Sequence, residues 1–234
     1  PWNMLKWCMP LQVENPVTHA ESAYGITRRQ QEHVKMPHSE FYMHRYVDIA
    51  SPDGQGITLA NNSRYSFGLN ENRLELVLAR SSMYAQGNNV NWYDPLETYD
   101  YADWGKIEFK LALLPHGRKN TAVEWNMLAK RLDEPYQYLM DHCHKGTLKL
   151  ANYSMGRSLT DGVRLALIKK CEDDDSFIVR VEEILGIDHT ADTSPAAVEF
   201  LGKKYEFVIG HDELKTLKIT QDGRLTAVDL LEWE

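Results

Sequence analysis

The sequence has no apolar run long enough to cross a membrane and no cluster of basic residues. A membrane-spanning helix needs about 20 consecutive apolar residues, and no stretch of the 234 residues approaches that length. Lysine and arginine are scattered, and the formal net charge is −8. A nucleic-acid-binding protein needs a basic face that displaces phosphate counterions. We therefore expect neither a membrane nor a nucleic acid as a partner.

Cysteine is scarce, and the three cysteines share no motif spacing. Cys8, Cys143 and Cys171 are an odd number, which is typical of reduced thiols in a cytoplasmic protein. No basic-then-apolar leader opens the chain, and it begins at Pro1 without an initiating methionine. We therefore expect a cytoplasmic location and a fragment of a longer polypeptide.

The sequence also lacks the motifs of hydrolytic and phosphate-binding sites. None of the 34 acidic residues lies in a recognisable catalytic motif, and there is no G-x-S-x-G nucleophile. His142 and His144 could share one face of a strand and bind zinc, but no partner spacing supplies the further ligands of a tetrahedral site. We expect no catalytic residue, no metal and no cofactor in this chain.

Short strands separated by turn formers fill the first half of the chain. Residues 41–50 are rich in aromatic and branched side chains and are followed by a Ser-Pro-Asp-Gly turn. Residues 73–81 are expected to pair with the strand before Asn70. The clearest alternation is "KIEFKLALL", in which Ile107, Phe109, Leu111 and Leu113 would share the buried face of one strand.

A second series of strands begins near Gly146, after one helical segment. Residues 121–132 have a helical period with Val123, Leu128 and Leu132 near one face, and Pro135 ends the pattern. Short strands at regular spacing are typical of a sandwich. The sequence therefore predicts an all-β protein, with a sandwich domain in residues 1–140 and a smaller β-sandwich domain in 141–234.

A long irregular segment, residues 82–104, is the first candidate for ligand binding. It alternates Tyr and Trp with Asn and Asp and has no regular period. Aromatic faces bind the C–H patches of sugars, and carboxylates and amides bind their hydroxyls. Loops of this length in compact domains are often functional. The composition is compatible with a carbohydrate contact.

The order of several motifs resembles the region that follows the catalytic domain in family 38 glycoside hydrolases, the retaining α-mannosidases. Asn62, Ser63, Arg64 and Tyr65 occupy the best-marked positions of the family's "NdsKYGy" element. Ser66 stands where the family has Gly after the Tyr. The matching segments are "MLKWCMPLQV", "YGITRR", "HRYVDIASPDGQGITLANNSRYSFG", "RLELVLARS", "DWGKIEFKLALLPH", "GVRLALIKKCEDDDSFIVRVEEILG" and "TAVDLLEWE".

The resemblance implies a non-catalytic role for this chain within a larger enzyme. The first domain would be part of a large β super-sandwich, and the chain would form one wall of the substrate cleft and support the catalytic domain. In the family, an N-terminal α/β domain carries the zinc ion and the carboxylate nucleophile. Asn62, Tyr65 and Asp103 are the residues expected to reach the cleft and to contact a mannose-containing oligosaccharide. The resemblance leaves assembly into homo-oligomers open.

Two other functions remain open from the sequence. One is a free-standing carbohydrate-binding β-sandwich module, which would use the aromatic segment 82–104. The other is a structural interaction module, whose sign would be an apolar surface for a partner domain.

Overall fold

A computed structural model describes residues 3–30, 40–70, 72–82, 105–134, 136–142, 144–146, 152–186 and 191–233. In these ranges the strands form four sheets, so the expected all-β fold is confirmed. The chain divides into two compact units. Unit 1 contains Pro1–Glu21, Arg28–Lys119 and Arg131–Asp133, and unit 2 contains Ser22–Thr27, Asn120–Lys130 and Glu134–Glu234. The domain boundary expected after residue 140 stays a prediction.

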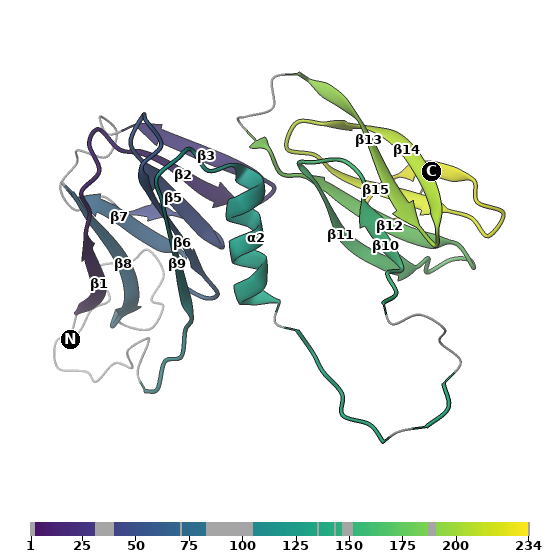
Figure 1. Cartoon of the computed structure of the whole chain (residues 1–234), viewed down its shortest axis with the longest axis horizontal. Helices are drawn as coiled ribbons and strands as arrows, with labels where there is room; N and C mark the ends of the chain where they lie inside the picture. Colours follow the sequence, from purple (N-terminus) through teal and green to yellow (C-terminus); the bar gives the residue numbers. More distant parts are fainter. Residues whose placement is uncertain are drawn as a thin grey trace, which may run out of the picture. The chain divides into compact units, whose positions relative to one another are not determined.

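Unit 1 is built from two sheets that lie in separate layers (Figure 1). One sheet has the strand order β1-β8-β7-β4, and the other has the order β3-β2-β5-β6-β9, of which the end of β2 and the first half of β3 fall within the Ser22–Thr27 segment of unit 2. The strands are β1 (Met4–Pro10), β2 (Val17–Ser22), β3 (Gly25–Gln30), β4 (Phe41–Tyr42), β5 (Tyr46–Ala50), β6 (Gly56–Asn61), β7 (Ser66–Asn70), β8 (Arg73–Arg80) and β9 (Leu111–His116).

The core of unit 1 takes side chains from both sheets. Val47, Ile49 and Leu59 come from β5 and β6, while Phe67 and Leu76 come from β7 and β8, and all five are fully buried. Alternate residues of a strand point to the same face, so each sheet presents a row of branched and aromatic side chains to the other. Their burial is the main force that holds the two layers together.

Unit 2 repeats this two-layer arrangement with its own core (Figure 1). Its sheets have the orders β10-β13-β14 and β11-β12-β15-β16. Val179, Val181 and Leu217 of one sheet are buried against Val198 and Phe200 of the other. The strands are β10 (Gly156–Ser158), β11 (Val163–Lys170), β12 (Phe177–Glu183), β13 (Thr193–Phe200), β14 (Lys203–Gly210), β15 (Leu214–Ile219) and β16 (Leu225–Val228).

The predicted pairing of residues 73–81 with the strand before Asn70 is confirmed, but the strand predicted at 107–113 is shorter than expected. β7 pairs with β8 in antiparallel register through Asn70 and Arg73. β9 begins only at Leu111, and Leu113 is 42% exposed. β9 is the edge strand of its sheet, and none of its residues is buried. The alternation of residue types therefore does not translate into burial.

Helix α2 (Ala122–Asp133) is the predicted helix, but it buries another face. Thr121 is its N-cap and forms a capping box with Glu124. The buried side chains are those of Ala122, Trp125, Asn126 and Ala129 rather than the expected Val123, Leu128 and Leu132. This spacing of three and four residues is one helical face, and Trp125 supplies most of its apolar area. Among the described residues, no helix has the length and apolarity of a membrane span.

Candidate functional site

Two of the three residues expected to reach a ligand lie in the connection between β6 and β7. We call residues 61–65 the Tyr65 turn. Asn62 and Tyr65 both belong to it, and the whole turn lies in unit 1. Asp103 lies outside the described residues, so its place beside these two residues stays a prediction.

Asn61 holds the Tyr65 turn in shape. Its side chain is buried, and its Oδ1 accepts hydrogen bonds from the backbone N–H groups of Ser63 (3.0 Å) and Arg64 (2.5 Å). Its Nδ2 donates to the carbonyl of His44 at 3.0 Å, and its backbone N–H donates to the carbonyl of Arg45 at 2.8 Å. An asparagine that bonds the backbone two and three residues on replaces the hydrogen bonds of a regular turn. Asn61 therefore fixes both the shape of the turn and its attachment to residues 43–45.

Asn62 connects the turn to the segment before β9. Its Oδ1 accepts a hydrogen bond from the backbone N–H of Lys110 at 2.8 Å, and the Ser63 hydroxyl lies 3.4 Å away. The side-chain oxygen is thus engaged within the fold. A contact between Asn62 and a ligand stays a prediction.

Tyr65 presents a half-exposed ring at the end of the turn. Its exposed fraction is 50%, and its carbonyl accepts a hydrogen bond from Met43 N–H at 3.0 Å. The ring lies beside the imidazole of His44, with centroids 6.1 Å apart and an angle of 34° between the planes. Among the described residues, none forms a hydrogen bond with the Tyr65 hydroxyl. The backbone of Tyr65 is therefore held in place while the residue is half-exposed.

A buried ion pair lies behind this aromatic pair. Glu21, the last residue but one of β2, accepts hydrogen bonds from Arg45 Nε at 3.0 and 3.1 Å and from the Arg45 backbone N–H at 2.8 Å. The carboxylate also lies 3.6 Å from His44 Nδ1. A buried charge is tolerated when it is paired and hydrogen-bonded. The Glu21–Arg45 pair meets both conditions and fixes residues 43–45 against β2.

Arg64 covers the ring of Phe109 on the other side of the turn. Its guanidinium carbon lies 5.5 Å from the ring centroid, a distance at which the ring quadrupole attracts the cation. Together with the Asn62–Lys110 bond, this contact holds the Tyr65 turn against residues 109–110. The turn is therefore attached on both sides to segments distant in sequence.

A second buried polar cluster in unit 1 serves the fold. His116 Nε2 lies 3.0 Å from Asp48 Oδ1, which also accepts a hydrogen bond from Thr58 at 2.6 Å. His116 Nδ1 lies 2.9 Å from the carbonyl of Gly54 and 2.8 Å from that of Arg118. The side chains of His116 and Asp48 are 5% and 2% exposed. A ligand does not reach this cluster, which joins β9 to β5 and β6.

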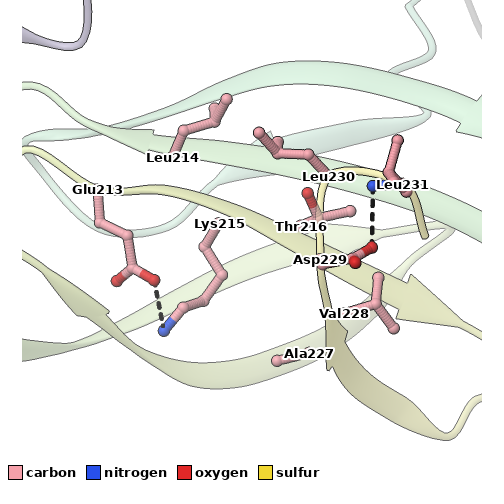
Figure 2. Close-up of a pocket in the computed structure, with 9 residues that line it drawn as sticks. All are labelled: Glu213, Leu214, Lys215, Thr216, Ala227, Val228, Asp229, Leu230 and Leu231. Carbon is pink, nitrogen blue, oxygen red and sulfur yellow. Dashed lines mark hydrogen bonds and ion pairs between the residues drawn. The ribbon is translucent and has the colours of Figure 1, made fainter. Parts of the chain in front are cut away.

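Unit 2 contains an open hollow of about 580 Å³ along β15 and β16 (Figure 2). Its charged groups are already engaged: Glu213 pairs with Lys215 at 3.2 Å, and Asp229 Oδ1 accepts the backbone N–H of Leu231 at 2.9 Å. The hollow has no free pair of carboxylates of the kind that glycoside hydrolysis needs. None of the predicted site residues lines it.

Beside this hollow, Glu232 anchors the turn that follows β16. Its Oε2 accepts the backbone N–H of Glu172 at 3.1 Å, and its Oε1 lies 2.6 Å from Lys169 Nζ. The hydrogen bond from Lys169 lowers the pKa of Glu232 below its ordinary value. The leucines Leu230 and Leu231 remain exposed on the anchored turn.

The two histidines considered as zinc ligands are not part of a described metal cluster. His144 Nε2 lies 2.8 Å from Asp141 Oδ2 on an exposed segment, and Cys143 lies outside the described residues. The hydrogen bonds of His144 to the Lys145 carbonyl and to Asp141 raise the pKa of His144. Among the described residues, no group of three or more His, Cys, Asp or Glu side chains converges.

Sequence reasoning missed His44, Glu21 and Arg45 as neighbours of Tyr65. They come from β2 and from the β4–β5 connection, far from Tyr65 in the sequence. The sequence offered one signal, the "HRY" tripeptide that leads into β5 at Tyr46, and this tripeptide is too common to indicate a site alone.

Comparison with known proteins agrees with the family resemblance. Residues 3–88 match the family model described as "Glycosyl hydrolases family 38 C-terminal domain". A search of curated protein sequences gave no match. The fold is similar to the crystal structure of an alpha-mannosidase from Enterococcus faecalis V583, with a TM-score of 0.70 and 15% identity over 92% of this chain. A protein in the glycosyl hydrolase family 38 from Enterococcus faecalis gives a TM-score of 0.61 and 15% identity over 86% of the chain.

The chain spans only part of these solved structures. It covers 25% of the first and 22% of the second, which is about a quarter of their length. The Tyr65 turn lies within the segment that matches the family model. The expected resemblance is thus confirmed: residues 3–88 match the model of the family 38 C-terminal domain, and the fold is similar to part of a solved alpha-mannosidase.

Proposed function

We propose that this chain is the non-catalytic C-terminal region of a retaining α-mannosidase and forms one wall of its substrate cleft. The observation that carries the proposal is the half-exposed Tyr65 ring on a fixed turn inside the family-matching segment. An aromatic face can pack on the C–H patch of a sugar while its hydroxyl bonds a sugar hydroxyl. The proposed ligand is a mannose-containing oligosaccharide.

The zinc ion and the nucleophile are proposed to belong to an N-terminal catalytic domain of the intact enzyme. This assignment is supported by the described residues of this chain, in which no group of three or more His, Cys, Asp or Glu side chains converges. In the intact enzyme, zinc would supply Lewis-acid chemistry to the reaction. The part of this chain is to position the sugar.

A separate observation favours a contact between this chain and another domain. Tyr136, Tyr138, Leu139 and Met140 are each more than nine-tenths exposed, at 93%, 92%, 91% and 94%. These four large side chains lie within five residues, interrupted only by Gln137, and such an exposed group often marks an interaction site. We propose that this run contacts the catalytic domain in the intact enzyme.

A cytoplasmic location is part of the proposal. Cys8, which is exposed, and Cys171, which is buried, are both free thiols. Free thiols are typical of proteins in reducing compartments.

The proposal is tested by nuclear magnetic resonance titration of the 234-residue chain with methyl α-D-mannopyranoside. We expect saturable shift changes in the backbone amides of residues 61–65 and weaker binding by Tyr65→Phe. The hydroxyl contributes one hydrogen bond, so the loss is about 0.5–1.5 kcal/mol. The melting temperature of Tyr65→Phe should match that of the wild type, because no described residue bonds this hydroxyl.

Two outcomes would contradict the proposal. Saturable shifts confined to residues 82–104 would favour a free-standing carbohydrate-binding module. A titration without saturable shifts, up to the solubility limit of the sugar, would remove the cleft-wall role and leave a structural interaction module.

A further inference from the structure

We propose that His44 is a second ligand-contacting side chain and that it binds the same sugar ring as Tyr65. The inference rests on the proposed function, because it takes Tyr65 as the first contact. His44 has a side chain that is 47% exposed, and its imidazole centroid lies 6.1 Å from that of Tyr65. The Tyr65 ring supplies an aromatic surface, and the Tyr65 hydroxyl and the imidazole nitrogens of His44 supply polar atoms beside it.

The backbone of residues 43–45 is fixed on both sides. On one side, His44 N–H donates to the Glu21 carbonyl at 2.8 Å, and Arg45 N–H donates to Glu21 Oε2 at 2.8 Å. On the other side, Met43 N–H donates to the Tyr65 carbonyl, and Asn61 donates to the carbonyls of His44 and Arg45. Every one of these bonds uses main-chain atoms of residues 43–45. The segment is therefore held in place without the imidazole of His44.

The imidazole is consequently available for a ligand and is carried by a fixed backbone. A ring that is about half exposed contributes little burial to the core, so packing alone does not explain its position. A ligand that meets a fixed backbone does not have to order that segment, which lowers the entropic cost of binding. Tyr65 has the same combination of a fixed backbone and an exposed ring.

The carboxylate of Glu21 sets the direction in which His44 can bond. It lies 3.6 Å from His44 Nδ1, and its negative charge favours the tautomer with the proton on that nitrogen. Nε2 then carries a lone pair that accepts a hydrogen bond. A sugar hydroxyl can donate to Nε2 while a second hydroxyl bonds the Tyr65 hydroxyl. The pair thus fits a neutral pyranoside whose C–H face lies on the Tyr65 ring.

The test uses the same chain and methyl α-D-mannopyranoside, with His44→Ala and a matched control. We expect His44→Ala to raise the Kd about two- to tenfold, the effect of losing one hydrogen bond. The control is His211→Ala in unit 2, since His211 is also partly exposed and has a carboxylate 2.9 Å from Nδ1, that of Asp212. This variant should bind the sugar as the wild type does. Melting temperatures check that both variants are folded.

A series of mono-deoxy mannosides gives a readout that a purely structural role would not move. Suppose that His44 accepts a hydrogen bond from one sugar hydroxyl. The analogue without that hydroxyl should then bind the wild type more weakly than the parent sugar does. His44→Ala should bind the analogue and the parent sugar equally well. This is a double-mutant cycle across protein and ligand. The Nε2 nitrogen resonance of His44 should also shift when the parent sugar is added.

Distinct results separate failure of this inference from failure of the proposed function. If Tyr65→Phe weakens binding but His44→Ala leaves the Kd unchanged, His44 is not a contact and the cleft-wall proposal stands. The inference is also overturned if every deoxy analogue changes the Kd of the wild type and of His44→Ala by the same factor. If the wild-type chain shows no saturable binding, both fail together.

Discussion

Asn61 is the residue on which the geometry of the Tyr65 turn depends most. Its amide bonds two backbone N–H groups of the turn and the carbonyl of His44, and its side chain is buried. Removing the amide leaves these partly buried partners without their bonds. A fully buried group without its bond costs about 1–3 kcal/mol, and a partly buried group costs less. Asn61 therefore matters for the relative position of Tyr65 and His44.

We expect Asn61→Ala to lower the free energy of unfolding by about 2–4 kcal/mol. Urea denaturation at neutral pH measures this change. The matched control is Asn62→Ala, which loses one bond to the Lys110 N–H from a half-buried side chain and should cost less. Equal losses for the two variants would show that Asn61 has no special part in the turn.

His44 shows why the site was only partly predictable. The sequence placed Tyr65 on a turn through its family pattern, and the structure confirms a turn between β6 and β7. No local pattern relates His44 or Glu21 to that turn, because their meeting depends on the pairing of β2 with β5 and β5 with β6. Residues that meet through sheet topology leave no fixed spacing in the sequence.

Among the elements, helix α2 has the clearest terminal signal. Thr121 Oγ1 lies 3.4 Å from the Glu124 N–H, and the Glu124 carboxylate accepts the Thr121 N–H at 2.9 Å. These two bonds satisfy backbone donors that have no partner inside the helix. The cap therefore determines where the helix begins.

Thr121→Ala should lower the free energy of unfolding by about 1 kcal/mol, the usual cost of losing an N-cap side chain. Thr121→Ser keeps the hydroxyl and should stay close to the wild type. Thermal unfolding followed by circular dichroism compares the two variants. A loss in the serine variant as large as that in the alanine variant would argue against the cap.

The turn after β16 depends on the charge of Glu232. The hydrogen bond from Lys169 lowers the pKa of Glu232. The Glu232 carboxylate therefore binds a proton more weakly in the folded state than in the unfolded chain. The stabilisation is therefore present above the ordinary carboxyl pKa and is lost as the pH falls through the lowered value in the folded state. Neutral pH keeps the turn anchored to β11 and β12.

We expect Glu232→Gln to be less stable than the wild type at neutral pH, with a difference that shrinks as the pH falls below about 4. Denaturation in urea at several pH values measures it. Lys169→Met, which removes the partner, should show the same pH trend. A difference that stays constant with pH would mean that the Glu232 charge does not contribute.

The strands were predictable from local pattern, whereas burial was not. Residues 73–81 alternate and follow a turn, and β7 and β8 pair as expected through Asn70 and Arg73. Leu113 and the helix face at Val123 were assigned to the interior from periodicity alone. The structure exposes Leu113 at a sheet edge and buries Trp125 instead. Which face is covered depends on the neighbouring layer, and a single segment carries no information about it.

At the scale of the whole molecule, the chain consists of two β-sandwich units with separate cores. Each core lies between two sheets, so each unit has the layered architecture of a domain that can bury its own apolar surface. The similar solved structures contain about four times as much chain. We proposed different partners for two exposed features: another domain for the run from Tyr136 to Met140, and a sugar for the Tyr65–His44 pair.

We predict that this chain alone does not hydrolyse an aryl α-mannoside. Retaining hydrolysis needs two carboxyl groups about 5–5.5 Å apart, one as nucleophile and one as acid and base. Near the Tyr65 turn, Glu21 is engaged by Arg45, and Asp48 is buried against His116. The rate at which the aryl alcohol is released should therefore equal the rate in buffer without protein, and added zinc should not raise it. An intact α-mannosidase run in parallel establishes that the assay detects activity. Turnover by the purified chain that disappears in Glu21→Gln would show that a catalytic carboxylate lies in this β region after all.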